Sequence, residues 1–351
     1  MFNLGIDRHK NYSQVAVLDE KGKFVMNVRL ANKKETFTTF INQLGKPCQA
    51  VIESGYSWGI IYDLLEELGV DVTLAHSLKV KAIASAKIKT DTIDAHTLAK
   101  LLYANLIPTV YVPTKDVRQQ KDILRQRSWL VKLRTMVKNR IHQIIERNHV
   151  QLPGFSDLFG RGGRKFLDSL TLPQPDESLL RQHLQLLDFT SEQIKQTETW
   201  IEETLKDNRY RKIIETIPGF GKTLSALVAL EINEIARFSY PGKLAAYAGL
   251  VPTTYASGGK VYHGDLLPGC NRWLRYAFIE ASWKAMVTSP YCRALFERMR
   301  KNKGPHTAVV VLARRLAEIV YCCLKENRGY EERCYPIDKI YFRLPSGRVN
   351  H

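Results

Sequence analysis

Four carboxylates in the first hundred residues offer the first candidate chemistry. Asp7 and Glu53 each end a predicted strand, while Asp91 and Asp94 stand three residues apart at the start of a predicted helix. That spacing places both aspartates on one helical face. Hard divalent cations take oxygen ligands, and a pair of ions needs several carboxylates to offset its charge. Each carboxylate alone is better explained as a turn, cap or solvated residue, so only their combination favours a metal site.

A serine beside two glycines is the second candidate. Ser257 precedes Gly258 and Gly259, which leave room for a phosphate backbone to approach its hydroxyl, and Lys260 and His263 follow closely enough to stabilise charge. A serine that attacks a phosphodiester forms a phosphoserine, which conserves the bond for rejoining strands. From these residues alone, an ordinary loop remains the more economical interpretation.

A tight turn, Ile217–Thr223, opens a predicted helix. Its Pro-Gly-Phe-Gly core is similar to the hairpin of helix-hairpin-helix proteins, in which backbone amides hold a DNA phosphate. Gly219, Gly221 and Lys222 are the candidate contacts, and a purely structural turn is an equally good interpretation. A nucleotide-hydrolase phosphate loop is excluded, because Thr216 occupies the position of its first glycine.

The elements that must position the carboxylates follow a definite order. Alternation and helical periodicity predict three strands, then helix, strand, helix, strand and helix: Phe2–Asp7, Ser13–Leu18, Lys23–Leu30, Glu35–Leu44, Ala50–Glu53, Trp58–Leu68, Asp71–Ala75 and Asp91–Ala104. This order is typical of a ribonuclease H-like α/β domain. In such a sheet the first and fourth strands are neighbours and the last helix crosses their ends, so the four carboxylates would converge.

A helical arm is predicted to follow, and we divide the chain at 1–112, 113–207, 208–328 and 329–351. Residues 115–148 lack Gly and Pro and carry ten Lys and Arg against three Asp and Glu, a net charge of +7. A flexible loop is expected at 151–176, then a helix over Glu177–Lys206. Either a solvated helical hairpin or a nucleic-acid-facing coiled coil fits; the charge favours the second, with candidate contacts Lys132, Arg134, Lys138 and Arg140. The third unit is predicted to be mostly helical around an irregular stretch, Gly249–Gly269.

The overall composition points to a polyanionic partner. The 351 residues carry 52 Lys and Arg against 35 Asp and Glu, a net charge of +17, and 44% are hydrophobic, which excludes a disordered chain. Nucleic acid is the favoured partner, with an anionic membrane surface as the alternative. No run is long enough for a membrane span and no secretory signal is visible, so we expect a cytoplasmic protein. The six cysteines have no zinc-site or disulfide pattern.

Together these motifs resemble transposases of the insertion-sequence one-ten family, also described as bridge-RNA-guided DNA recombinases with a RuvC-like domain. The resemblance rests on the Asp7, Glu53, Asp91, Asp94 tetrad, the Ile217–Thr223 turn, and the stretch Tyr247–Lys260 followed by Gly269–Arg275, in this order over about residues 1–328. Some members carry Ser-Ser-Gly-Gly, whereas Ala256 precedes Ser257 here. Ser257 is therefore the available serine, and Thr253 and Thr254 are less favourable hydroxyls.

The resemblance implies roles for these residues. The tetrad would bind Mg²⁺, as two ions per site with Mn²⁺ as a substitute, and Ser257 would be the nucleophile. The active site would combine the RuvC-like domain of one protomer with the serine-bearing domain of another, in a dimer that assembles to a tetramer on donor and target DNA. A structured guide RNA would choose the DNA sequences, and the protein would work at the prokaryotic nucleoid. Further nucleic-acid contacts are expected at Lys260, Arg272 and Arg275, although an exposed basic face explains the two arginines equally well.

Two other functions remain open at this point. A metal-dependent endonuclease resembling a Holliday-junction resolvase would use water in place of Ser257. A non-catalytic scaffold would need neither the tetrad nor the serine. Lys87 and Lys89, which precede Asp91, suit a phosphate backbone entering the site, although solvated lysines are the default.

Overall fold

The described residues form two compact units, divided between Pro113 and Thr114. A computed structural model describes residues 1–45, 47–55, 57–84, 90–257 and 259–332, apart from the side chains of Val261 and His263. Lys87, Lys89, Gly258 and most of the expected tail at 329–351 lie outside the described residues. The arm and the helical body belong to one compact unit, and a domain boundary between 207 and 208 stays a prediction.

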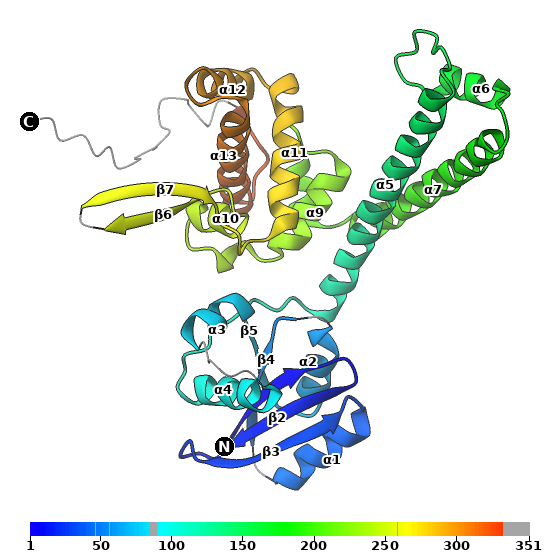
Figure 1. Cartoon of the computed structure of the whole chain (residues 1–351). Helices are drawn as coiled ribbons and strands as arrows, with labels where there is room; N and C mark the ends of the chain where they lie inside the picture. Colours follow the sequence, from blue (N-terminus) through cyan, green and yellow to red (C-terminus); the bar gives the residue numbers. More distant parts are fainter. Residues whose placement is uncertain (46, 56, 85–89, 258, 333–351) are drawn as a thin grey trace, which may run out of the picture. The chain divides into compact units, whose positions relative to one another are not determined.

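The first unit is a mixed α/β fold built on a five-stranded sheet (Figure 1). The strand order is β3-β2-β1-β4-β5; β1 pairs antiparallel with β2 and parallel with β4. The elements are β1 Phe2–Arg8, β2 Tyr12–Leu18, β3 Phe24–Ala31, α1 Lys34–Leu44, β4 Cys48–Glu53, α2 Trp58–Glu67, β5 Asp71–Ala75, α3 Ser77–Ile83 and α4 Asp91–Tyr103. The predicted strands and helices all form, and α3 is an addition that the sequence analysis did not predict.

The two faces of this sheet are covered differently. Leu4 and Ile6 of β1 pack in the hydrophobic cluster that includes α1 and α2, while α4 lies on the opposite face (Figure 1). Successive strand residues alternate between faces, so Gly5 and Asp7 of β1 face α4. A Cβ on Gly5 would lie 2.0 Å from the Ala95 carbonyl oxygen. The missing side chain therefore allows α4 to pack directly on β1, beside Asp7.

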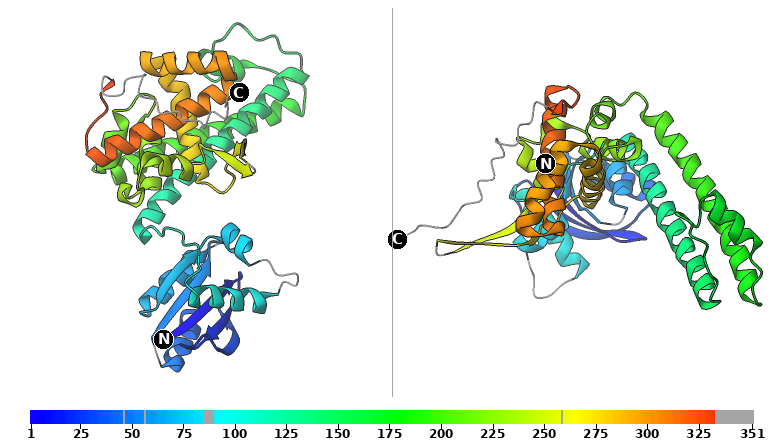
Figure 2. Two further views of the ribbon diagram at one scale, coloured as in Figure 1. Left: turned by 90° about the vertical axis from the view of Figure 1, so that its left-hand side faces the viewer. Right: turned by 90° about the horizontal axis from the view of Figure 1, so that it is seen from above.

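The second unit begins with a helical arm. Two long helices, α5 Lys115–Arg147 and α7 Asp176–Leu205, run side by side and are joined at their far end through α6 Arg161–Ser169 (Figure 2). The expectation of a flexible loop at 151–176 needs correction, because the segment contains α6 and buries Leu158 and Leu167 against the long helices. A Cβ on Gly163 would lie 2.1 Å from the Leu158 carbonyl oxygen. This glycine permits close packing, whereas the sequence suggested flexibility.

The body of the second unit is mostly helical. Its core joins α13 to the helices around it, and the elements are α8 Arg209–Glu215, α9 Lys222–Ile232, η1 Ile235–Arg237, α10 Pro241–Tyr247, α11 Arg272–Thr288, α12 Pro290–Lys303 and α13 Pro305–Glu326. The stretch Gly249–Gly269, expected to be irregular, instead forms a β-hairpin that extends from the body, with β6 Pro252–Ser257 and β7 Lys260–Leu266 (Figure 1). The reason is local: two segments rich in β-branched and aromatic residues flank Gly259, which takes a φ of +75°.

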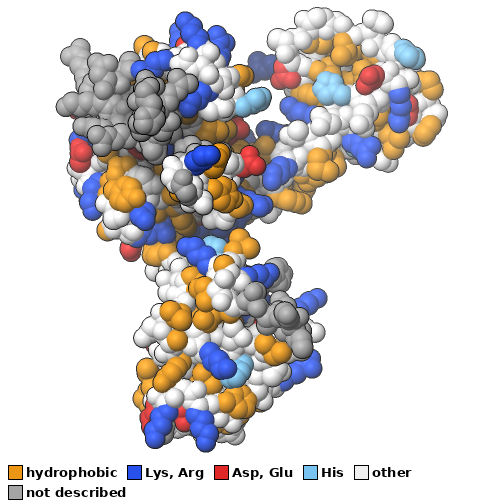
Figure 3. Space-filling view, turned by 60° about the vertical axis from the view of Figure 1, so that its left-hand side comes forward, with side chains coloured by type: hydrophobic (Ala, Val, Ile, Leu, Met, Phe, Trp, Pro, Cys, Tyr) orange, Lys and Arg blue, Asp and Glu red, His pale blue; other side chains and the backbone are white. Residues whose placement is uncertain are grey.

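No helix among the described residues is both long and apolar enough to cross a membrane. Lys and Arg side chains are visible on both units (Figure 3).

Candidate active site: a carboxylate cluster and a serine hairpin

Sheet register brings two of the four predicted carboxylates to one end of the first unit. Ile6 of β1 pairs with Ile52 of β4 in parallel register, so Asp7 and Glu53 follow at equivalent positions. Asp7 and Glu53 each follow a residue that is buried on the opposite face of the sheet, Ile6 or Ile52, and therefore face α4. Both side chains are half-buried.

Helix α4 begins at the third carboxylate. The Thr90 hydroxyl caps the helix by accepting a hydrogen bond from the Ile93 amide at 3.3 Å, which fixes where the first turn starts. Asp91 and Asp94 lie in that turn, where the helix dipole favours negative charge. The packing of Gly5 against Ala95 holds this helical end over Asp7.

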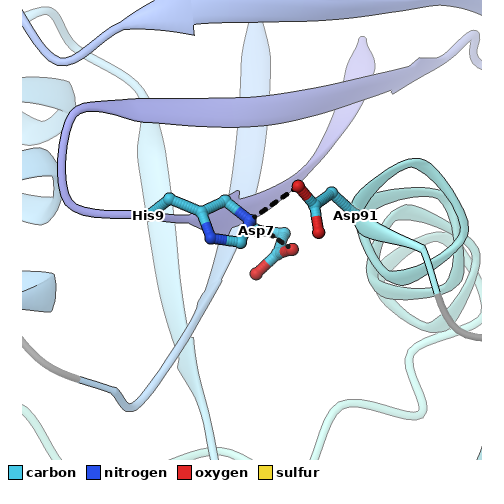
Figure 4. A group of neighbouring side chains, drawn as sticks. All are labelled: Asp7, His9 and Asp91. Carbon is cyan, nitrogen blue, oxygen red and sulfur yellow. Dashed lines mark hydrogen bonds and ion pairs between the residues drawn. The ribbon is translucent and has the colours of Figure 1, made fainter.

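A histidine that the sequence analysis missed links the two carboxylates. His9 Nε2 lies 3.1 Å from Asp7 Oδ2 and 3.1 Å from Asp91 Oδ2 (Figure 4). Among the described residues, Asp7, His9 and Asp91 form the group of three whose candidate ligand atoms all lie within 4.8 Å of one another. The sequence feature that could have identified His9 is its position two residues after Asp7, just beyond the end of β1.

An aromatic and cationic layer supports this group. Tyr12 donates a hydrogen bond to Asp91 Oδ2 at 2.9 Å, and its ring stacks on His9 with a centroid separation of 4.7 Å. The Arg29 guanidinium lies 3.5 Å from the Tyr12 ring centroid. These contacts restrict the orientation of both Asp91 and His9, as the supporting residues of a metal site must do.

The electrostatics of the cluster favour a bound cation. Burial raises the pKa of Asp7, His9 opposes that shift, and the charges of Asp94 and Asp91 raise the pKa further. The ionised carboxylates therefore repel one another at short range, and a divalent cation would relieve this repulsion. The predicted tetrad is thus partly assembled: Asp7 and Asp91 meet, Asp94 affects Asp7 through its charge, and Glu53 shares their sheet face. Glu53 and Asp94 lie outside the group of closest ligand atoms.

Ser257 lies at the end of the exposed hairpin in the second unit. It pairs across the strands with Lys260, and Tyr255 pairs with Tyr262. Residues that pair directly, and residues two apart on a strand, share one face of a hairpin. One face therefore carries the serine, the lysine and both tyrosines, which are 66% and 61% exposed.

The predicted phosphate-binding turn, Ile217–Thr223, contains residues in different environments. Gly219, at a φ of +91°, packs against α11, where a Cβ would lie 2.1 Å from the Ala281 carbonyl oxygen. Close helix packing thus requires a glycine here, and the expected phosphate contact of its backbone stays a prediction. Gly221 is the exposed N-cap of α9. The exposed Lys222 forms an ion pair with Glu202 at 3.4 Å.

The other predicted nucleic-acid contacts also separate into exposed and structural residues. Arg272 is exposed, whereas Arg275 is half-buried and donates a hydrogen bond to the Leu267 carbonyl, a contact that anchors that loop. On the arm, Lys132 and Arg140 are exposed, Arg134 is half-buried, and Lys138 Nζ lies 4.6 Å from the Phe159 ring centroid. Lys260 is exposed on the hairpin.

Two family models match the chain. Residues 4–149 match the IS110-type DEDD model, described as a transposase, and residues 211–297 match the model described as "Transposase IS116/IS110/IS902 family". The first match contains Asp7, Glu53, Asp91 and Asp94, and the second contains Ser257. Between them they cover more than half of the chain.

Curated relatives extend the similarity over nearly the full length. The chain is 26% identical to "Transposase for insertion sequence element IS1111A" of Coxiella burnetii over 351 residues, covering 94% of this chain and 91% of the relative. It is 26% identical to "Probable family 20 transposase" of Pseudomonas aeruginosa over 349 residues, 93% and 98% of the two chains. Similarity to "Insertion element IS110 uncharacterized 43.6 kDa protein" of Streptomyces coelicolor is 31% over 144 residues, 40% of this chain and 35% of the relative.

Proposed function

The chain belongs to the IS110/IS116 family of transposases, and on this premise we propose that it cuts and rejoins DNA with two catalytic parts. One is the carboxylate cluster of the first unit and the other is Ser257 of the second. The observation that carries the proposal is the meeting of Asp7, His9 and Asp91 where β1 ends and α4 begins. We assign the first unit to the ribonuclease H-like folds, because its strand order and the helix across β1 agree with that architecture.

The residues of the first unit fit a divalent metal site. Asp7 and Asp91 offer oxygens within reach of one another, Asp94 and Glu53 face the same region, and His9 offers a nitrogen. Two bound cations, which we propose to be Mg²⁺ with Mn²⁺ as a substitute, would activate the attacking oxygen and stabilise charge on the leaving oxygen. The chain's own contribution is to orient the ligands, through the Thr90 cap, the Tyr12 hydrogen bond and the packing at Gly5.

Ser257 supplies the nucleophile in this proposal. The Ser257 hydroxyl gives up its proton as its oxygen bonds to the phosphorus of a DNA phosphodiester, the bond from phosphorus to one deoxyribose oxygen breaks, and that oxygen takes up a proton and leaves as a hydroxyl. Lys260 pairs with Ser257 across the hairpin and shares its face, and in this proposal it would bind a non-bridging phosphate oxygen. Reversal of the step with a different deoxyribose hydroxyl rejoins strands without an external energy source.

The partners follow from the family and from charge. We propose donor and target DNA as substrates, a structured guide RNA that selects them, and a dimer that assembles to a tetramer, with the two catalytic parts supplied by different protomers. The net charge of +17 supports a protein that holds several phosphate backbones. We place its activity in the cytoplasm at the nucleoid, where chromosomal DNA lies.

A covalent adduct is the direct test of this function. Full-length protein, Mg²⁺, the candidate guide RNA and labelled DNA are incubated, denatured and resolved by gel. We expect a protein–DNA adduct with the wild type and with Thr254→Ala, whose side chain lies on the other face of β6, and none with Ser257→Ala. The alternative, a metal-dependent endonuclease that uses water, requires cleavage without an adduct and at equal rates in all three proteins. That result would overturn the assignment of Ser257.

A further inference from the structure

A groove in the second unit lies between α5 and α11, outside the two catalytic parts described above. Its cavity has a volume of about 410 Å³. The lining side chains include three cations, two aromatic rings and a hydroxyl: Arg127, Lys132, Arg272, Trp273, Tyr276 and Ser128. Rings and cations in one groove are the combination that binds unpaired nucleotides, because a base stacks on a ring while its phosphate meets a cation.

The cations of the groove differ in availability. Arg127 is held by Glu198, with an N–O distance of 2.7 Å. Lys132 and Arg272 are exposed, and neither has an ion-pair partner in the part of the chain that the structure describes. These two side chains are therefore free to take up a phosphate.

The aromatic rings of the groove provide a platform. Trp273 is half-buried and packs against the hydrophobic core of the body, while Tyr276 is 47% exposed. Burial raises the pKa of the Tyr276 phenol, the charge of Glu280 raises it further, and Arg127 opposes the shift, so the ring stays neutral at physiological pH. A neutral ring beside an anchored indole suits stacking against a base.

A buried polar network fixes the two walls of the groove. Glu231 of α9 accepts a hydrogen bond from Lys121 of α5 at 3.1 Å and one from Asn271 at 2.8 Å. Asn271 also caps α11 and accepts hydrogen bonds from the amides of Trp273 and Leu274 at 3.0 Å. One carboxylate thus joins the base of the arm to the helix start that carries Arg272 and Trp273, so the groove is preformed.

We infer that this groove binds one unpaired nucleotide of an RNA strand. The base lies against Trp273 and Tyr276, and Lys132 and Arg272 bind the adjoining phosphate. Ser128 favours RNA over DNA. Its hydroxyl donates a hydrogen bond to the Leu124 carbonyl at 3.0 Å, so its oxygen lone pairs remain to accept a hydrogen bond from a ribose 2′-hydroxyl. The inference rests on the proposed function only in taking RNA as a partner, and it requires neither Ser257 nor the carboxylates.

The test is binding of short labelled single strands to the full-length protein, measured by fluorescence anisotropy. The probes are an oligouridylate, the deoxyribose strand of the same sequence, and an RNA duplex. We expect the oligouridylate to bind most tightly, and Tyr276→Ala and Arg272→Ala each to weaken its binding about tenfold. Ser128→Ala should lower the preference for RNA over DNA about fivefold.

Matched controls separate the groove from general basic surface. Tyr240→Ala removes a tyrosine that is 54% exposed, and Arg298→Ala removes an exposed arginine of α12; both should bind like the wild type. Photocrosslinks from a thiouridine-containing strand should map to Trp273 or Tyr276.

Three outcomes would overturn the inference: unchanged affinity in the groove variants, equal losses in the controls, or crosslinks confined to other elements. Equal binding of DNA and RNA, unaffected by Ser128→Ala, would overturn the choice of RNA. Because the readout is binding, failure of the adduct experiment leaves this test unaffected.

Discussion

The carboxylate cluster and the serine hairpin are built in opposite ways. Asp7 projects from a sheet that is covered on both faces, and its neighbours are fixed by a helix cap, a stacked ring and a backbone contact at Gly5. Ser257 lies on a two-stranded hairpin whose residues near the turn are exposed. Metal ligands need fixed geometry before the cation arrives, whereas a nucleophile on an exposed hairpin can take its final position against its substrate. Under the proposed function, the first part would therefore be preorganised and the second would be completed by DNA.

The largest effect is expected from Asp7→Asn. Loss of an anionic ligand should reduce strand cleavage at least about a thousandfold, since the metal-supplied charge stabilisation amounts to several kcal/mol. The melting temperature should not fall, because burial and neighbouring carboxylates already disfavour the charge on Asp7. A cleavage assay and a thermal melt measure both quantities. Asp71→Asn, at an exposed position of β5, is the control, and near-normal cleavage by Asp7→Asn would refute the metal site.

Two glycine substitutions test the contrast in construction. Gly5→Ala places a Cβ 2.0 Å from the Ala95 carbonyl oxygen, so α4 must move away from β1. We expect the unfolding free energy to fall by about 1–3 kcal/mol or more, and the cleavage activity to be lost as well. In Gly259→Ala the added Cβ meets no atom within 4 Å. The only cost is backbone strain at a φ of +75°, about 1–2 kcal/mol and local to the hairpin. Urea unfolding with cleavage assays compares them. Equal destabilisation of the whole fold by both changes would contradict the contrast.

A smaller effect is expected from His9→Ala. Removal of the imidazole that joins Asp7 and Asp91 should reduce cleavage about 10–100-fold at limiting metal concentration, as losses beside metal ligands do. Excess Mg²⁺ should restore part of the activity, because the carboxylates remain. His306→Ala, at an exposed position of α13, is the matched control. Titration of Mg²⁺ against cleavage rate measures the effect, and superimposable curves for His9→Ala and the wild type would exclude His9 from the site.

The smallest effect per residue is expected on the arm. Exchanging Lys132 and Arg140 for Gln should weaken nucleic-acid binding a few-fold at moderate salt and lower the salt-dependence slope by about 0.7–0.9 for each phosphate that the protein no longer neutralises. Arg298→Gln on α12 provides the control. Affinity measured across a salt series decides, and an unchanged slope would show that these arm cations do not bind phosphate.

Much of the first unit could be predicted from sequence because its signals are local. Alternation in β1, β2 and β4 and periodicity in α4 follow directly from which residues are buried, and the spacing of Asp91 and Asp94 fixes their shared face. His9 escaped because one of its two partners, Asp91, comes from α4, far away in the sequence.

Two glycines show what the sequence pattern left out. Gly163 suggested flexibility, yet it allows a close backbone approach to Leu158, and Gly219 likewise allows a close approach to Ala281. A sequence shows that a glycine is present but does not distinguish the need for a turn from the need for close packing. The hairpin around Ser257 was missed for the same reason, since its glycines outweighed the β-forming residues beside them.

The alternation of side chains along β6 also constrains how this gene can vary. Strand residues alternate between faces, so one codon inserted between Tyr255 and Ser257 would turn the serine to the face that Ala256 occupies. An insertion of two codons would return the hydroxyl to the original face. Under the proposed role of Ser257, reading-frame-preserving insertions in β6 should be inactivating when the number of added codons is odd and tolerated when it is even.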